Sequence, residues 1–292
     1  MIKDSLGDRM KAYEVVSKTR LVNRMPVIIR LDGKAFHTFT RGFRKPFDEL
    51  LNKTMQETMK YLCENIQGCV LGYTQSDEIT LVLIDYQNLN SSAWFDYEVL
   101  KLTSVSASLA TYAFNKYFTK AVSELSNNLD LDKVLHPSTV TEKREKLVET
   151  YKKAASKGAY FDSRVFNIPK EEVTNCVYWR QLDAERNSVS SLAQSLFSHK
   201  SLQGLSTKKL IEKIETEKGI VWGNLPTTQK RGCCCVKVYE KVVGAKMDKN
   251  GLTEFTVPTT DAIRGIWTID NDIPKFKDEG REYIEKLVFV GE

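Results

Sequence analysis

The chain has 292 residues, about the length of two domains or of one domain with a large appendage. Hydrophobic residues make up 41% of it and charged residues 28%, a composition that excludes wholesale disorder. No apolar run approaches the roughly 18 residues that cross a bilayer, so we expect no membrane association. The first residues carry charge where a signal peptide needs an apolar core, and the six cysteines form no spaced pairs. These features predict a cytoplasmic protein with reduced thiols.

The net charge of +5 is concentrated at the beginning of the chain, where residues 1–45 hold 11 Lys and Arg against 4 Asp and Glu. Such a basic segment favours attraction to a polyanion, with nucleic acid or nucleotide phosphates as the obvious candidates. A solvated surface is the alternative. Four phenylalanines lie among these charges, and we expect them to pack in the core rather than stack on bases: Phe36, Phe39, Phe43 and Phe47.

The first third of the chain alternates between helical and strand patterns. Residues 8–20 predict a helix, and residues 26–33 predict an apolar strand that ends on Asp-Gly. Pro46 is expected to open a helix with apolar residues at helical spacing, which Gly68 closes. Residues 69–84 predict a β-hairpin with an acidic residue at its tip.

The remaining pattern predicts helices interrupted by single strands. The polar, patternless stretch 124–146 is expected to be a loop or insertion, with a short helix resuming near Glu142. The other elements expected are a helix over 94–118, a strand over 159–166, a long helix from Pro169 to Phe197, a small helix over 207–214, a strand over 232–243 that contains three consecutive cysteines, and a separate, looser tail over 247–292.

This order of elements predicts an α+β fold, an antiparallel palm-like (ferredoxin-like) sheet backed by helices. We expect residues 1–140 to form the part of the catalytic domain with the metal and nucleotide motifs. Residues 141–246 would complete that domain, and residues 247–292 would form a C-terminal extension.

Asp32 and Asp77 are the candidate catalytic acids, since one ends a strand and the other sits at a hairpin tip. Adjacent strands lie about 4.8 Å apart, so the two carboxylates can meet. Such a pair repels itself unless a hard cation is bound, and Mg²⁺ prefers one or two carboxylates with water and phosphate. Gly33 permits close approach of a phosphate and offers its carbonyl. The alternative is an ordinary Asp-Gly turn and a solvated hairpin tip.

Cationic and polar side chains flank this acidic pair. Lys34 and His37 follow Asp32 closely, while Lys45 and Asp48 straddle the start of the next helix. Cations and a histidine near a triphosphate can stabilise charge on phosphoryl oxygens. One face of the long helix carries a polar stripe formed by Arg180, Asp183 and Asn187. This stripe could order the metal site or contact a nucleotide. The alternative is an Arg–Asp ion pair on the surface, with Asn187 taking no part in function.

Taken together, these motifs resemble the tRNA-histidine guanylyltransferase family. The resemblance spans roughly residues 5–240 and rests on motifs in fixed order: residues 30–40 (RLDGKAFHTFT), 45–48 (KPFD), 72–78 (GYTQSDE), 161–165 (FDSRV), 179–187 (WRQLDAERN) and 230–232 (KRG). It implies a palm-like enzyme that adds nucleotides in the 3′-to-5′ direction to the 5′ end of tRNA. ATP would adenylylate the 5′-monophosphate, and the 3′-hydroxyl of an incoming nucleotide would then expel AMP.

The resemblance also implies roles for individual residues. Two Mg²⁺ ions would be bound by the carboxylates of Asp32 and Asp77 and the carbonyl of Gly33, and His37 and Lys45 would join them in catalysis. The nucleotide-binding residues would be Asp32, Gly33, Lys34, Ala35, Phe36, His37, Lys45, Asp48, Ser76, Asp77 and Asn187. The partners implied are tRNA, ATP, GTP and other nucleoside triphosphates, in a homo-oligomer, a dimer or tetramer.

One segment departs from the family pattern. Members that act on tRNA-histidine share a stretch His-Ile-Asn-Asn-Leu-Tyr-Asn where residues 185–191 here read ERNSVSS, with only Asn187 in common. This favours the guanylyltransferase-like subgroup that repairs 5′-truncated tRNA opposite a template. Histidine-specific addition of an extra G, a palm-fold nucleotide cyclase and a non-catalytic RNA-binding protein remain as alternatives.

Overall fold

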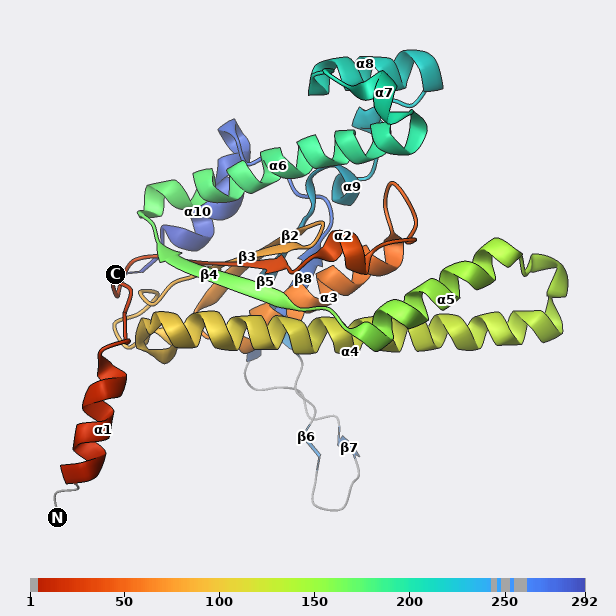
Figure 1. Cartoon of the computed structure of the whole chain (residues 1–292). Helices are drawn as coiled ribbons and strands as arrows, with labels where there is room; N and C mark the ends of the chain where they lie inside the picture. The colour runs from red at the N-terminus through yellow and green to blue at the C-terminus, as the bar shows by residue number, and fades with distance from the viewer. Residues whose placement is uncertain (1–4, 243–245, 248–252, 255–261, 292) are drawn as a thin grey trace.

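The computed structural model describes residues 5–242, 246–247, 253–254 and 262–291. Its centre is a six-stranded antiparallel sheet with the order β4-β1-β3-β2-β5-β8 (Figure 1). The predicted α+β fold is confirmed. The strands of this sheet are β1 (Val27–Gly33), β2 (Cys69–Gln75), β3 (Glu78–Leu83), β4 (Phe161–Asn167), β5 (Cys233–Val242) and β8 (Ala262–Asp270), while the short β6 (Lys246–Met247) and β7 (Thr253–Glu254) pair with each other.

Two long helices, α3 (Glu49–Asn65) and α4 (Val99–Leu135), cover one face of the sheet. Alternate residues of β1 point into this layer, since successive side chains of a strand face opposite sides. Val27, Ile29 and Leu31 are fully buried there beside Phe114 and Phe118 of α4. The prediction that the early phenylalanines are core residues is confirmed for two of them, Phe36 and Phe43.

The opposite face of the sheet packs against α6 (Lys170–Leu196) and α10 (Glu282–Val288). Ile28 and Val82 form this second core with Val173 and Val177 of α6. Toward the end of β1 the same face becomes polar, because the alternation places Arg30 and then Asp32 on it. The apolar part therefore anchors α6, and the polar part lies beneath the remainder of that helix.

An antiparallel helical hairpin formed by α4 and α5 (Glu142–Lys157) projects from the body (Figure 1). The loop predicted over 124–146 is wrong for its first part, since α4 continues to Leu135. Beyond the sheet α4 packs on α5 and buries a narrow stripe that includes Val122, Ser126 and Leu129. The helix predicted near Glu142 is confirmed; Thr141 caps it by accepting a hydrogen bond from the Arg144 amide at 3.2 Å.

The remaining helices within the described residues are short or peripheral. Pro46 precedes α3 rather than opening it; Asp48 caps the helix because its carboxylate accepts a hydrogen bond from the Leu51 amide at 3.0 Å. None of these helices is long and apolar enough to span a bilayer. The others are α1 (Ser5–Val15), α2 (Phe36–Phe39), α7 (His199–Leu202), α8 (Thr207–Lys218), which packs on the end of α6, and α9 (Thr227–Arg231).

The described part of the C-terminal segment belongs to the central sheet. β8 pairs with β5 from Cys234↔Asp270 to Val242↔Ala262, and α10 packs on the second core. The prediction of a separate, looser tail is therefore wrong for residues 262–291, while 248–252 and 255–261 lie outside the described residues. The domain boundary expected after residue 140 stays a prediction.

Replacing Phe276 by Ala tests whether this segment stabilises the fold. Phe276 is fully buried, with its ring 6.2 Å from that of Tyr73 in β2 and 5.7 Å from that of Tyr283. The free energy of unfolding, measured with denaturant, should fall by about 3–5 kcal/mol. Phe289→Ala is the matched control, since Phe289 is 51% exposed, and its effect should stay within about 0.5 kcal/mol. Equal effects would contradict the place of 262–291 in the core.

Candidate active site

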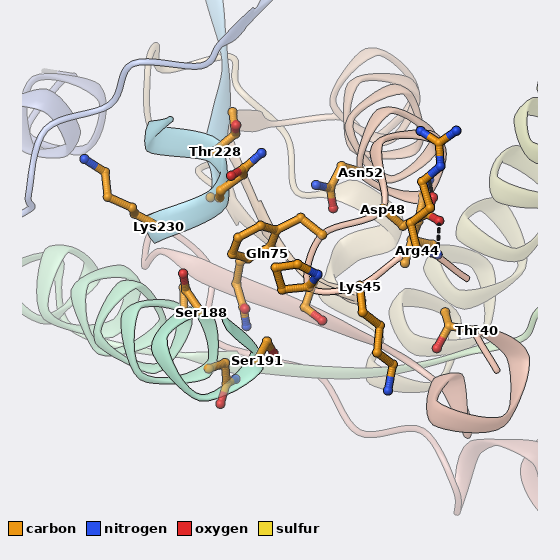
Figure 2. A pocket seen from close by; sticks show the side chains of 18 of the residues that line it. Thr40, Arg44, Lys45, Asp48, Asn52, Gln75, Ser188, Ser191, Thr228 and Lys230 are labelled. Atoms are coloured by element: carbon orange, nitrogen blue, oxygen red, sulfur yellow. Dashed lines mark hydrogen bonds between the residues drawn. The ribbon is translucent and has the colours of Figure 1, made fainter. Parts of the chain in front are cut away.

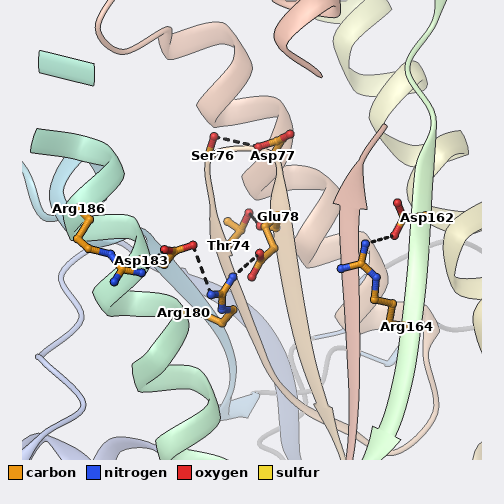
Figure 3. A network of polar contacts seen from close by, with 9 residues as sticks. All are labelled: Thr74, Ser76, Asp77, Glu78, Asp162, Arg164, Arg180, Asp183 and Arg186. Atoms are coloured by element: carbon orange, nitrogen blue, oxygen red, sulfur yellow. Dashed lines mark hydrogen bonds and ion pairs between the residues drawn. The ribbon is translucent and has the colours of Figure 1, made fainter. Parts of the chain in front are cut away.

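The two acidic turns meet at one end of the sheet. Asp32 is near the end of β1, and Asp77 lies in the two-residue turn between β2 and β3. The Gly33 amide donates a hydrogen bond to the Asp77 carbonyl at 3.0 Å, so the two backbones are in direct contact. Ser76, also in this turn, donates its hydroxyl to the Asp77 carboxylate at 3.1 Å (Figure 3). The structure thus brings Asp32, Gly33 and Asp77 together.

The carboxylate of Asp77 is electrostatically unfavourable as it stands. Burial raises its pKa, and the nearby Asp32 raises it further, while hydrogen bonds and His37 act in the opposite direction. Within the described residues, neither Asp32 nor Asp77 has a Lys or Arg at ion-pair distance. These two carboxylates therefore favour a cation from outside the chain.

Two further carboxylates flank Asp32 but have cationic partners. In the strand register Asp32 faces Glu78 of β3 on one side and Asp162 of β4 on the other. Glu78 is 8% exposed and binds Arg180 of α6 at 2.9 Å, and Asp162 pairs with Arg164 at 3.4 Å (Figure 3). Burial raises the pKa of Glu78 and Arg180 opposes that shift. Glu78 and Asp162 are thus paired with arginines, whereas Asp32 and Asp77 are not paired with a Lys or Arg of the described residues.

The polar stripe predicted on α6 faces the sheet. Arg180 is buried, bridges Glu78 to Asp183 with a contact of 3.3 Å to the latter, and stacks on the Trp179 ring at 3.6 Å. Its surface-pair alternative is therefore wrong for Arg180. Asn187, two turns along, is exposed and reaches a cavity beside the hairpin tip. The stripe thus links the acidic turn to this cavity.

The cavity has a volume of about 330 Å³ and lies between the loop before α3, the hairpin tip, α6 and α9 (Figure 2). Four of the predicted nucleotide-binding residues line it: Lys45, Asp48, Ser76 and Asn187. Other polar residues that line the same space were not predicted from the sequence: Asn52, Gln75, Ser188, Ser191, Thr228 and Lys230. Ser188 and Ser191 could have been found, because they follow Asn187 on one face of a helix.

Other predicted site residues lie outside the wall of this cavity. Lys34 and Ala35 are exposed on the turn between β1 and α2, and His37 is exposed at the beginning of α2. The Phe36 side chain is 4% exposed and packs against Phe114, so its ring serves the core; the nucleotide-binding role expected for Phe36 would fall to its backbone and stays a prediction. A Cβ atom at position 33 would lie 2.3 Å from the Phe36 ring, so the packing of this ring requires a glycine there.

Asp48 is a buried anchor of the cavity wall. Its carboxylate accepts hydrogen bonds from the Leu51 amide, the Arg44 amide at 2.9 Å and the Tyr151 hydroxyl at 2.6 Å. Burial and this bond to Asp48 raise the pKa of Tyr151. Because its oxygens are already used, Asp48 holds the shape of the loop that carries Lys45.

Comparison with known proteins identifies the family. The family model described as tRNAHis guanylyltransferase (Thg1) matches residues 7–169, more than half of the chain. The chain belongs to the Thg1 family. It is thus a nucleotidyltransferase of the tRNA guanylyltransferase type. An uncharacterized protein of Acanthamoeba polyphaga mimivirus, R259, is 30% identical to it over 84% of this chain and 82% of its own length.

Solved structures of the Thg1 family share the fold along almost the whole chain. A bacterial tRNA(His) guanylyltransferase (Thg1)-like protein in complex with ATP superimposes with a TM-score of 0.73 and 37% identity. A bacterial protein of the same description in complex with GTP gives a TM-score of 0.69 and 34% identity. Each comparison covers 98% of this chain and 100% of the other.

The segment that departs from the pattern of histidine-specific Thg1 members has structural partners here. Glu185 forms ion pairs with Arg231 at 3.5 Å and Lys275 at 3.4 Å, and Ser188 accepts a hydrogen bond from the Trp222 indole at 3.0 Å. Residues of 185–191 therefore bind neighbouring parts of the fold, while Asn187 and Ser191 line the cavity.

Replacing Arg180 by Met should lower the free energy of unfolding by about 3–5 kcal/mol, because Glu78 then stays buried without its cation. The double variant Arg180→Met with Glu78→Met should recover much of this loss, since no uncompensated charge remains. Arg186→Met, on the same helix and also paired with Asp183 but 61% exposed, should change stability by less than about 1 kcal/mol. Denaturant unfolding measures all three variants. If the double variant showed no recovery, the role of Arg180 as the cation that neutralises Glu78 would be refuted.

Proposed function

We propose that this Thg1-family protein adds nucleotides in the 3′-to-5′ direction to the 5′ end of tRNA, opposite a template, and so repairs 5′-truncated molecules. Its substrates are ATP for activation and GTP or another nucleoside triphosphate for extension. The observation that carries the proposal is the 3.0 Å backbone hydrogen bond from the Gly33 amide to the Asp77 carbonyl. It brings together the turns of Asp32 and Asp77, whose carboxylates have no cationic partner within the described residues, beside a cavity of about 330 Å³. Family membership and the ATP and GTP complexes of similar structures support it.

Asp32, Asp77 and the Gly33 carbonyl would hold two Mg²⁺ ions. An all-oxygen set on two unneutralised carboxylates fits a hard cation that keeps water and phosphate ligands. When bound, the ions stabilise the attacking and leaving oxygens of phosphoryl transfer.

The cavity would bind the activating ATP. Lys45 is exposed on the loop before α3, where its ammonium group can bind phosphate (Figure 2). Asn187 and Ser76 also line the cavity and offer hydrogen bonds. Asp48 fixes the loop that presents Lys45. The exposed turn with Lys34, Ala35 and His37 would bind the triphosphate of the incoming nucleotide through side chains and backbone amides.

Two displacements at phosphorus would follow one another. An oxygen of the 5′-monophosphate attacks the α-phosphorus of ATP, and pyrophosphate leaves. The 3′-hydroxyl of the incoming nucleotide then attacks the activated 5′-phosphorus and AMP leaves, so the new nucleotide brings its own triphosphate to the 5′ end. His37 is the group we assign to accept the hydroxyl proton, as a neutral imidazole, since it is exposed and lies near Asp77.

Templated addition is favoured over histidine-specific addition by the contacts of residues 185–191. Glu185 and Ser188 are engaged with Arg231 and Trp222, so these positions are not free to recognise one particular tRNA. A tRNA without its first 5′ nucleotide, supplied with ATP, Mg²⁺ and each nucleotide separately, distinguishes the two. We expect only the Watson–Crick partner to be incorporated; G alone, added without pairing, would support the histidine-specific alternative.

Asp32→Asn and Asp77→Asn should each lower nucleotide addition by more than about 100-fold, because even outer-shell partners of metal ligands are worth 10 to 100-fold. The isosteric change should leave the fold intact, as thermal unfolding would show. Asp162→Asn is the control at the same sheet edge, since its carboxylate is paired with Arg164, and it should retain activity. Unchanged activity in the first two variants would refute the assignment of the site, and tRNA binding alone would favour a non-catalytic role.

Lys45→Ala should slow adenylylation of a 5′-monophosphorylated tRNA more than extension of a tRNA that already carries a 5′-triphosphate. The physical reason is that Lys45 lines the cavity assigned to the activating ATP and not the turn assigned to the incoming nucleotide. Single-turnover rates with the two RNA substrates measure the difference, each substrate serving as the control for the other. Equal slowing of both steps would argue against a separate activation site.

A further inference from the structure

A second and larger groove lies beside the candidate active site, between the loop over 42–47 and the first turns of α5. We call it the arm groove; its volume is about 910 Å³. The side chains that give it its character are Arg44, Lys45, Phe47, Lys143, Arg144 and Lys146. Basic residues stand on both walls, while aromatic and aliphatic groups lie between them.

The charge of the arm groove is strongly positive and only partly neutralised. Glu142 is the acidic residue on its wall, and it pairs with Lys146. Arg144 binds Asp132 of α4 at 2.7 Å. In the part of the chain that the structure describes, Arg44, Lys45 and Lys143 have no ion-pair partner, and all three are exposed. Unpaired cations on two facing walls attract a polyanion.

The two walls are held at a fixed separation in the free protein. The Phe43 ring packs on the Tyr151 ring of α5 at 4.8 Å between centroids. Asp48 joins the same two parts, because it accepts hydrogen bonds from both the Arg44 amide and the Tyr151 hydroxyl. A groove that is already formed loses little conformational entropy on binding its ligand.

The arm groove is continuous with the cavity at the hairpin tip. Four residues line both spaces: Phe43, Arg44, Lys45 and Phe47. A polyanion whose end lies in the cavity would therefore pass over Lys45 and Arg44 and reach Lys143 of α5. A mononucleotide would fill only the smaller cavity, of about 330 Å³.

We infer that the arm groove binds the sugar–phosphate backbone of the RNA substrate next to its 5′-terminal nucleotide. This inference rests on the proposed function, which places the activating ATP in the adjoining cavity and so brings the 5′-phosphate that attacks it to the same place. The α4–α5 hairpin is then an RNA-binding arm, and Lys143 is its contact farthest from the reacting phosphate. Phosphate contacts of this kind position the RNA and add affinity without reading its sequence.

Lys143→Ala tests the inference through the salt dependence of binding. With a 5′-truncated tRNA transcript and the full-length protein, the affinity should fall about threefold to fivefold at moderate salt. The slope of log K against log salt concentration should decrease in magnitude by about 0.7 to 0.9, the loss of one phosphate contact. The affinity for ATP alone should not change, since Lys143 does not line the cavity.

Lys152→Ala is the matched control. Lys152 is an exposed lysine of the same helix, but it lines the separate groove between α4 and α5. Equal slopes for Lys143→Ala and wild type, or an equal loss for both variants, would overturn the inference, as would weakened ATP binding in Lys143→Ala. The measurement needs no turnover, so a wild-type protein without nucleotide addition would refute the proposed function while the salt slopes still decide the role of the groove.

Discussion

The structure depends on the pairing of β1 with β3, which brings the end of β1 and the turn before β3 together at one end of the sheet. The backbone hydrogen bond from the Gly33 amide to the Asp77 carbonyl joins the strand end to the turn, and Asp32 adds to the burial that raises the pKa of the Asp77 carboxyl. Repulsion between them is thus built into the fold, and hydrophobic burial on both faces of the sheet supplies the stability that tolerates it. A bound cation relieves that repulsion.

The neighbouring carboxylates differ from Asp32 and Asp77 in having cationic partners. Glu78 and Asp162 lie on either side of Asp32 in the same register, yet each has an arginine partner. Arg180 comes from α6, so the position of that helix on the second core determines which acid is neutralised. Helix packing and the electrostatics of the site are therefore coupled through one buried guanidinium group.

Local patterns were enough to predict the elements that build this edge. The apolar run of β1, the hairpin signal around Asp77 and the proline before α6 are short-range features. The errors arose where structure depends on distant partners. The second half of α4 buries a narrow stripe, so most of its residues are polar and show no clear helical pattern. The position of β8 is determined by its pairing with β5, which the sequence of β8 alone does not reveal. The cavity was missed for the same reason, since Asn52, Gln75 and Thr228 come from three separate segments.

Asp48 shows how one buried carboxylate in a recognisable motif can hold several segments of the fold together. Its one carboxylate caps α3, holds the Arg44 amide and binds Tyr151 of the arm. The loop between these contacts carries Lys45 on the wall that the cavity shares with the arm groove. A single buried group therefore holds the wall that the cavity and the groove share. An RNA bound along the arm would then reach the cavity with its 5′ end already aligned, and Lys45 would need no rearrangement to meet the activating nucleotide.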